Sequence, residues 1–160
     1  MSRKSIAALV LVWLASLIFI PLACAQGTDV AVVVNSNSPV TNVSSADLRK
    51  IFGGEKRTWP NGVPIKLIVR PPGCHERLVL LRILGMSESE YKQYWTAQVL
   101  RGEADAEPLT VPSFGMVKEA TVAFPGAISL MDAVDVKPGM NLKVISVDRL
   151  MPGEAGYRLH

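Results

Sequence analysis

The first 25 residues determine how much of this 160-residue chain is left to fold. Arg3 and Lys4 precede a nearly continuous apolar stretch, which ends in small residues around Ala25. A basic start, an apolar run and small residues before a cleavage point are typical of a secretory signal peptide. We therefore expect residues 1–25 to be removed after Ala25 during export. Residues 26–160 would then work in the periplasm or another exported compartment.

Two other interpretations of this segment stay open. A run of about 18 apolar residues approaches the length of a bilayer span, so the segment also fits an uncleaved anchor. Pro21, near the end of the run, favours cleavage, and cleavage leaves no stable membrane span. Cys24 allows a lipoprotein interpretation in which its thiol carries the lipid. This interpretation is less favoured, because lipoprotein signals usually have a leucine-like residue where Pro21 stands.

Removal of this segment changes both the charge and the cysteine content. Two of the 17 Lys and Arg residues lie within residues 1–25 and none of the 14 Asp and Glu residues do, so the remainder carries a net charge of +1. Nucleic-acid binding needs a basic surface, and we expect none here. Cys74 becomes the single cysteine, which excludes an internal disulfide. The fold must then depend on its apolar core.

Hydrophobic patterns in residues 26–160 predict strands interleaved with helices. A β-branched run predicts a buried strand over 29–35, and serines at helix starts predict N-caps at Ser44 or Ser45, at Ser87 and at Ser113. The expected elements, in order, are a strand over 29–35, a short helix ending before Gly53, a strand over 65–70, a helix over 76–84, a helix from Ser87 to Gly102, a helix from Ser113 to Phe124, and strands over 127–131 and 142–147.

This order predicts a single α/β domain over residues 26–160. Alternating strands and helices are typical of a three-layer sandwich, and we expect a mixed, mostly parallel sheet. Tyr91, Tyr94 and Trp95 recur at helical spacing, and we interpret them as core residues rather than as a ligand-stacking surface. The acidic segment 103–107 is expected to be a solvated loop, with a partner-facing edge as the alternative.

Five segments, taken in order, resemble a known family. They are Val32-Val-Val-Asn35 with Pro39-Val40, Leu48-x-x-Ile51-Phe52-x-Gly54 followed by Trp59, the turn and helix after Arg70, Tyr94-Trp95, and Phe124-Pro-Gly-Ala-Ile128. Together they are similar to one lobe of the type 2 extracytoplasmic solute-binding proteins of ABC importers, in particular those that bind phosphate. The resemblance covers about residues 30 to 148. It implies a binding protein whose two lobes close on a small anion.

The resemblance also implies a location for the ligand. In that family an arginine at a strand end precedes a Gly-Ser-Gly-Thr loop, whose N–H groups and hydroxyls face the anion at a helix N-terminus, where positive potential favours it. The expected ligand-binding residues here are Arg70, Gly73, Cys74 and His75, together with Ser38 in the polar loop after the first strand.

This chain departs from the family pattern within that loop. Arg70 matches the arginine and Gly73 the first glycine, but Cys74, His75 and Glu76 stand where the family has Ser-Gly-Thr. A thiol is a weaker donor than a hydroxyl, and Glu76 places negative charge beside an incoming phosphate. We therefore do not expect high-affinity phosphate binding. The alternative for Arg70 is a strand-end charge that pairs with Glu76.

The length of residues 26–160 suits one lobe of a family whose members have two. A second copy or an envelope protein would then supply the other wall of the site. The leading hypothesis is an exported solute-binding-like module that recognises a small anion or an envelope partner. The alternative is a structural or interaction accessory protein that has lost solute binding.

Enzymatic activity is not expected from this sequence. Cys74 and His75 are adjacent, and neighbouring residues on a helix point about 100° apart, so they do not face each other as a nucleophile and its base would. The two histidines, His75 and His160, lack the spacing of a metal site. We therefore expect neither a catalytic set, nor a metal, nor a cofactor.

Overall fold

A computed structural model describes residues 28–160 of the chain. The expected signal peptide, its cleavage point after Ala25 and the alternatives at Cys24 all lie outside the described residues. Within 28–160, none of the helices has both the length and the apolarity that a bilayer span needs.

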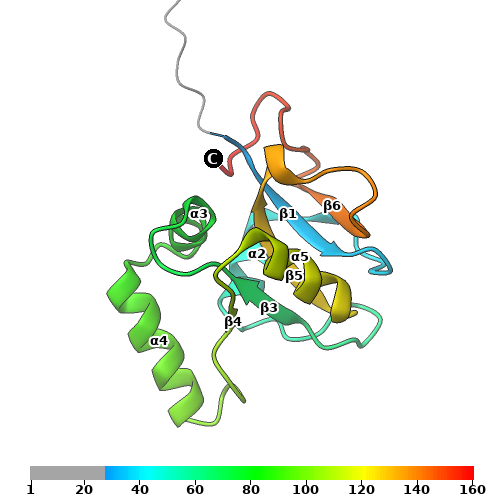
Figure 1. Ribbon diagram of the computed structural model, residues 1–160. Helices are drawn as coiled ribbons and strands as arrows, with labels where there is room; N and C mark the ends of the chain where they lie inside the picture. Colours follow the sequence, from blue (N-terminus) through cyan, green and yellow to red (C-terminus); the bar gives the residue numbers. More distant parts are fainter. Residues whose placement is uncertain (1–27) are drawn as a thin grey trace, which may run out of the picture.

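Strands and helices alternate along most of the described chain, with two helices in succession after the third strand (Figure 1). The elements in order are β1 (Val30–Asn35), β2 (Asn42–Val43), α2 (Ser45–Phe52), β3 (Lys66–Val69), α3 (His75–Leu84), α4 (Glu88–Leu100), β4 (Leu109–Thr110), α5 (Phe114–Ala123), β5 (Ala127–Asp132), the 3-10 helix η1 (Ala133–Asp135) and β6 (Leu142–Val147).

The six strands form one mixed sheet in the order β2-β6-β1-β5-β3-β4. β1 lies near its centre and runs antiparallel to both neighbours, β5 and β6. The other three pairings, β2 with β6, β3 with β5 and β3 with β4, are parallel. The predicted α/β fold with a mixed sheet is therefore confirmed.

Helices cover both faces of the sheet, because side chains along a strand point alternately to its two faces. Val30 and Val32 of β1 lie in the larger core cluster with residues of α2, α3 and α4, whereas Ala31 and Val33 lie in the smaller cluster with Val117 of α5. Figure 1 shows α5 over one face, with α3 and α4 on the other side of the molecule. These are the three layers that the sequence predicts.

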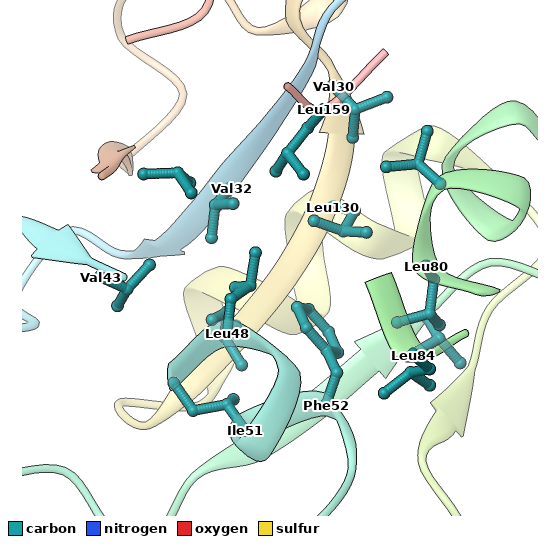
Figure 2. Close-up of a cluster of buried hydrophobic side chains, with 14 of the residues drawn as sticks. Val30, Val32, Val43, Leu48, Ile51, Phe52, Leu80, Leu84, Leu130 and Leu159 are labelled. Carbon is teal, nitrogen blue, oxygen red and sulfur yellow. The ribbon is translucent and has the colours of Figure 1, made fainter. Parts of the chain in front are cut away.

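The larger core cluster joins segments from both ends of the described chain. In Figure 2, Phe52 of α2 and Leu80 of α3 approach Leu130 of β5, while Leu159 lies beside Val30. All five side chains are buried. Each buried side chain of this size contributes roughly 1.5 to 3 kcal/mol relative to exposure, so this cluster is the main source of stability for residues 28–160, which contain one cysteine and no disulfide.

Local capping explains where the helices begin. The Ser44 hydroxyl accepts a hydrogen bond from the Asp47 amide at 3.0 Å at the start of α2. In α4, Ser87 and Glu90 form a reciprocal capping box. Ser113 caps α5 by accepting from the Met116 amide at 3.2 Å. The helix starts predicted from these serines are confirmed.

The aromatic residues of α4 attach this helix to the core. Tyr91 and Trp95 are buried, and the half-buried Tyr94 donates its hydroxyl to the Gly53 carbonyl at 2.6 Å. The interpretation of this group as core is therefore confirmed. Two strands of two residues each, β2 and β4, were not predicted, because two residues cannot show the alternation by which a strand is identified.

The segment after β6 returns to the start of β1. The Tyr157 hydroxyl donates to the Val30 carbonyl at 2.7 Å, and the Val30 amide donates to the Leu159 carbonyl at 2.7 Å. Tyr157 and Leu159 are both buried, and burial raises the pKa of the Tyr157 hydroxyl above its ordinary value. The last residues of the chain therefore hold Val30, the first residue of β1, in place.

Replacement of Tyr157 by phenylalanine is expected to lower the free energy of unfolding by about 1 to 2 kcal/mol, since it leaves the Val30 carbonyl without its side-chain donor. Urea unfolding followed by circular dichroism would measure the change. Tyr94→Phe is the control at a half-buried tyrosine–carbonyl bond, and it tests whether a loss is particular to the C-terminal segment. An unchanged midpoint for Tyr157→Phe would show that this segment is not anchored by the hydroxyl.

Candidate functional site

The expected ligand-binding loop lies between β3 and α3. Arg70 directly follows β3, and Pro71 and Pro72 cannot continue the strand because proline lacks the N–H that the sheet needs. Gly73 follows with a φ of 89°, which glycine adopts without strain. Cys74 is the N-cap of α3. We call Arg70, Gly73, Cys74, His75, Glu76 and Asp132 the β3–α3 corner.

Arg70 is held inside the protein rather than extended into solvent. Its side chain is 14% exposed, its Nε lies 3.5 Å from Glu76 Oε1, and its Nη1 donates to the Val111 carbonyl at 3.3 Å. The pairing of Arg70 with Glu76 that the sequence allowed is therefore present. Nε is buried and has no hydrogen-bond partner among residues 28–160, because 3.5 Å is a charge contact with poor hydrogen-bond geometry.

His75 and Asp132 form the second side-chain pair of the corner. Its Nδ1 lies 2.7 Å from Asp132 Oδ1, at the end of β5. Both side chains are partly exposed. A hydrogen bond at this nitrogen fixes the orientation of the imidazole ring, so the other ring nitrogen, Nε2, has a defined direction.

Cys74 occupies the N-cap position without acting as a cap. Its thiol makes no capping hydrogen bond to the first turn of α3, and the residue is partly buried. A thiol is a weak acceptor compared with the hydroxyl of serine. The first turn of α3 therefore lacks a side-chain cap, and a helix N-terminus in this state favours a negatively charged group.

Ser38 lies at the other end of the sheet. β5 runs parallel to β3 and antiparallel to β1, so the end of β1 lies level with the start of β3. Ser38 follows that end of β1, is buried, and accepts a bond from the Val40 amide at 3.4 Å. The structure thus brings Arg70, Gly73, Cys74 and His75 together and leaves Ser38 away from them.

An ion pair between the buried Arg77 and the partly exposed Glu88, next to the corner, was not found from the sequence. Arg77, only 5% exposed, donates from Nε and Nη2 to the two carboxylate oxygens of Glu88 at 3.0 and 2.5 Å. Its guanidinium also lies 3.8 Å from the centre of the Tyr91 ring. Arg77 lies on α3 and Glu88 on α4. The i, i+3 and i, i+4 spacing that indicates contacts within one helix therefore cannot indicate this pair.

The electrostatics of this pair follow from its geometry. Burial by itself would lower the pKa of Arg77, but the hydrogen bonds and charge of Glu88 raise it on balance. The Arg77 hydrogen bonds hold the pKa of Glu88 below its ordinary value. Burial raises the pKa of Tyr91 to about 12. All three groups therefore keep their ordinary charge states near neutral pH, and the pair stabilises the junction of α3 with α4.

The corner as a whole balances two basic groups against two carboxylates. Glu76 faces Arg70, and Asp132 faces His75. An anion would have to compete with these carboxylates, and a cation with the basic groups. Among residues 28–160, no three His, Cys, Asp or Glu side chains are grouped in a way that could hold a metal ion. The arrangement suits recognition of a polar group of modest charge.

Residues 26–147 match the sequence profile of a family described as the PBP superfamily domain. No curated protein matches the sequence. Among solved structures, an ABC-type phosphate transport receptor from Vibrio cholerae is 22% identical, with a TM-score of 0.61, over 78% of this chain and 48% of that one. A putative phosphate ABC transporter substrate-binding protein from Clostridium perfringens, solved with bound phosphate, is 17% identical with a TM-score of 0.62, over 78% and 46%. PstS from Borrelia burgdorferi is 19% identical with a TM-score of 0.58, over 78% and 49%.

These matches establish a shared fold. The chain spans about half the length of the solved structures that it resembles. The described residues thus correspond to about one half of such a protein.

Proposed function

This chain belongs to the PBP superfamily, and from that premise we propose that it is an exported, non-enzymatic binding module that takes a small oxyanion at the β3–α3 corner. The observation that carries the proposal is the Nε atom of Arg70, which is buried and has no hydrogen-bond partner among the described residues. Buried donors are nearly always satisfied in folded proteins, so an unsatisfied one is a position where a ligand or water belongs.

One further feature of the corner supports an anion as the ligand. The uncapped first turn of α3 adds the favourable potential of a helix N-terminus. A short oxyanion such as phosphate, sulfate or a small carboxylate could accept the hydrogen bond that Arg70 Nε lacks.

Glu76 sets the affinity in this proposal. Its carboxylate lies 3.5 Å from Arg70 Nε and thus occupies part of the space and charge that an anion needs. Like charges close together in a partly desolvated site repel strongly, so the protein's own carboxylate competes with the ligand. Binding of free phosphate is therefore weak, and ligands that tolerate a neighbouring carboxylate are preferred.

Calorimetry with phosphate, sulfate and acetate tests this assignment on protein purified from the periplasm of an expression host. Arg70→Ala is expected to abolish binding, because it removes the anion's partner. Glu76→Gln is expected to tighten binding by about tenfold, because it removes the competing charge while keeping the shape. Arg101→Ala, at an exposed arginine on the end of α4, is the control and should leave the affinity unchanged.

The outcome that contradicts the proposal is equally specific. If neither the native protein nor Glu76→Gln binds any of the three anions at millimolar concentration, the corner is not an anion site. Mass spectrometry of the same preparation tests export, since cleavage after Ala25 predicts a chain that starts at Gln26. A chain that still carries residues 1–25 would contradict this part of the proposal.

A second candidate is an interaction accessory without a solute ligand. The observation that favours it is the apolar surface beside the corner, where Leu78 and Val134 are 52% and 56% exposed. Leu78 lies one turn beyond Cys74 on α3, and Val134 follows Asp132 by two residues. A partner or a second copy would bury them. Light scattering of the native protein and of Leu78→Ser with Val134→Ser tests this, and a monomer in both cases excludes the second copy.

A further inference from the structure

A hollow of about 290 Å³ lies at the opposite end of β3 from Arg70. We call it the charged hollow. It is lined by Lys66 and Leu67 at the start of β3, by neighbouring parts of the segments 51–57 and 64–65, by Trp95 of α4, and by residues 104–109. None of these residues belongs to the β3–α3 corner. Its volume is close to the lower limit of small-molecule sites, which begin near about 300 Å³, so only a small ligand fits.

Apolar side chains form the inner wall of the charged hollow. Ile51 is fully buried and Trp95 is 3% exposed. The Trp95 ring lies against Gly54, where an added Cβ would approach ring atom Cη2 to 2.7 Å. Gly54 also has a φ of 75°, so glycine is needed there for both space and conformation. The position of the indole is thereby fixed, and its Nε1 is buried without a hydrogen-bond partner among the described residues.

Charges of both signs line the charged hollow without pairing across it. The basic residues of the lining flank the loop that contains Trp59, and they are Lys56, Arg57 and Lys66. The acidic residues, Asp105 and Glu107, lie in the segment before β4. Within residues 28–160, the only one of these five groups in an ion pair is Lys56, which lies 3.7 Å from Asp47, a residue outside the lining.

Two of the basic groups are directed by other contacts. Arg57 donates from Nε to the Gly54 carbonyl at 3.0 Å, and Lys66 Nζ lies 5.7 Å from the centre of the Phe124 ring. The remaining Arg57 nitrogens therefore stay available to a ligand, whereas Lys66 directs its ammonium group toward Phe124, outside the lining. On the acidic side, Glu107 accepts only a long bond, at 3.4 Å, from Thr96.

From these features we propose that the charged hollow binds a small zwitterion with an apolar body, such as a free apolar α-amino acid. The ligand's carboxylate lies toward Lys56 and Arg57, its ammonium group toward Asp105 and Glu107, and its side chain against Trp95 and Ile51. A ligand with both charges satisfies both sets at once, whereas an ion of one sign leaves one set facing like charge. This site lies apart from the anion site proposed above and does not depend on it.

Titration of the isotope-labelled protein with L-leucine, followed by amide chemical shifts, tests the proposal. Saturable shifts are expected at Gly54, Lys66, Ala106 and the Trp95 indole N–H. Two analogues isolate each charge: 4-methylpentanoate lacks the ammonium group, and isoamylamine lacks the carboxylate. Each is expected to bind about tenfold or more weakly than leucine, because hydrogen bonds to charged groups make contributions of that size. Equal binding of either analogue overturns the proposal, as does the absence of saturable shifts with leucine.

Variants locate the site and separate it from the corner. Arg57→Gln and Asp105→Asn should each weaken leucine binding by about tenfold, whereas Lys92→Gln, on an exposed position of α4 outside the lining, should have no effect. Arg70→Ala should also leave leucine binding unchanged. Loss of leucine binding in Arg70→Ala, or shifts confined to residues 70–76, would place the ligand in the corner and overturn the charged hollow as its site.

Discussion

Replacement of Gly126 by alanine is expected to destabilise the protein by at least about 3 kcal/mol. A Cβ at this position would lie 1.8 Å from the Pro64 carbonyl oxygen, a backbone atom that cannot move aside without displacing the loop before β3. The Gly126 carbonyl also accepts bonds from the Lys66 amide at 3.0 Å and from Trp59 Nε1 at 3.1 Å. The methyl group would therefore separate β5 from the loop before β3, and overpacking against backbone belongs to the most damaging substitutions.

Thermal and urea unfolding measure this effect, with Gly115→Ala as the matched control. Gly115 lies in the first turn of α5, and nothing lies within 4 Å of its added Cβ. Alanine there should be neutral or stabilise by up to about 1 kcal/mol, because it favours the helix. The two alanine variants thus have opposite expected signs. Equal stability of Gly126→Ala and the native protein would show that the close approach of Pro64 is not required.

Replacement of Arg77 by alanine is expected to lower the free energy of unfolding by about 2 to 4 kcal/mol. The change removes both hydrogen bonds to Glu88 and the contact with the Tyr91 ring, and it leaves a cavity between α3 and α4. Arg77→Lys should recover only part of the loss, because lysine cannot bind both carboxylate oxygens in a planar fork. Urea unfolding of the three proteins gives the comparison.

Arg101→Ala is the control for this prediction. Arg101 pairs with Glu103 at 2.8 Å, but both side chains are about half exposed, and such pairs contribute at most about 1 kcal/mol. A loss in Arg77→Ala no larger than in Arg101→Ala would contradict a structural role for the pair of Arg77 with Glu88.

The same pair predicts how stability depends on pH. Arg77 lowers the pKa of Glu88 in the folded protein, so the folded state favours the ionised carboxylate. Its contribution is complete above the ordinary glutamate pKa of about 4.3 and is lost as the pH falls through the lowered folded value. Between about pH 5 and pH 3, the free energy of unfolding should therefore fall more in the native protein than in Arg77→Ala. Parallel curves for the two proteins would contradict the link.

Much of the fold could be predicted because its signals are local. The β-branched run of β1 and the serine caps of α2, α4 and α5 lie within a few residues of the structure that they determine. β2 and β4 escaped prediction because each is defined by its partner in the sheet rather than by its own two residues.

The site could be predicted only where the residues in contact lie close together in the sequence. Arg70 and Glu76 lie within six residues, and their pairing was one of the two alternatives considered. His75 and Asp132 are 57 residues apart, and no local pattern joins them. Ser38 was grouped with Arg70, yet β1 runs antiparallel to both neighbours and carries the residues after it to the opposite end of the sheet. Strand direction depends on the whole topology, which a single sequence does not reveal.

The position of β1 in the sheet also governs when this protein can fold. β1 is the first strand of the described chain, but both of its neighbours, β5 and β6, come near the end. The Tyr157 bond to Val30 joins residues 127 positions apart. Contacts of such long range slow folding, because the chain loses the entropy of a large loop before it gains them. The central strand therefore stays without its two neighbours until almost the whole chain has been made.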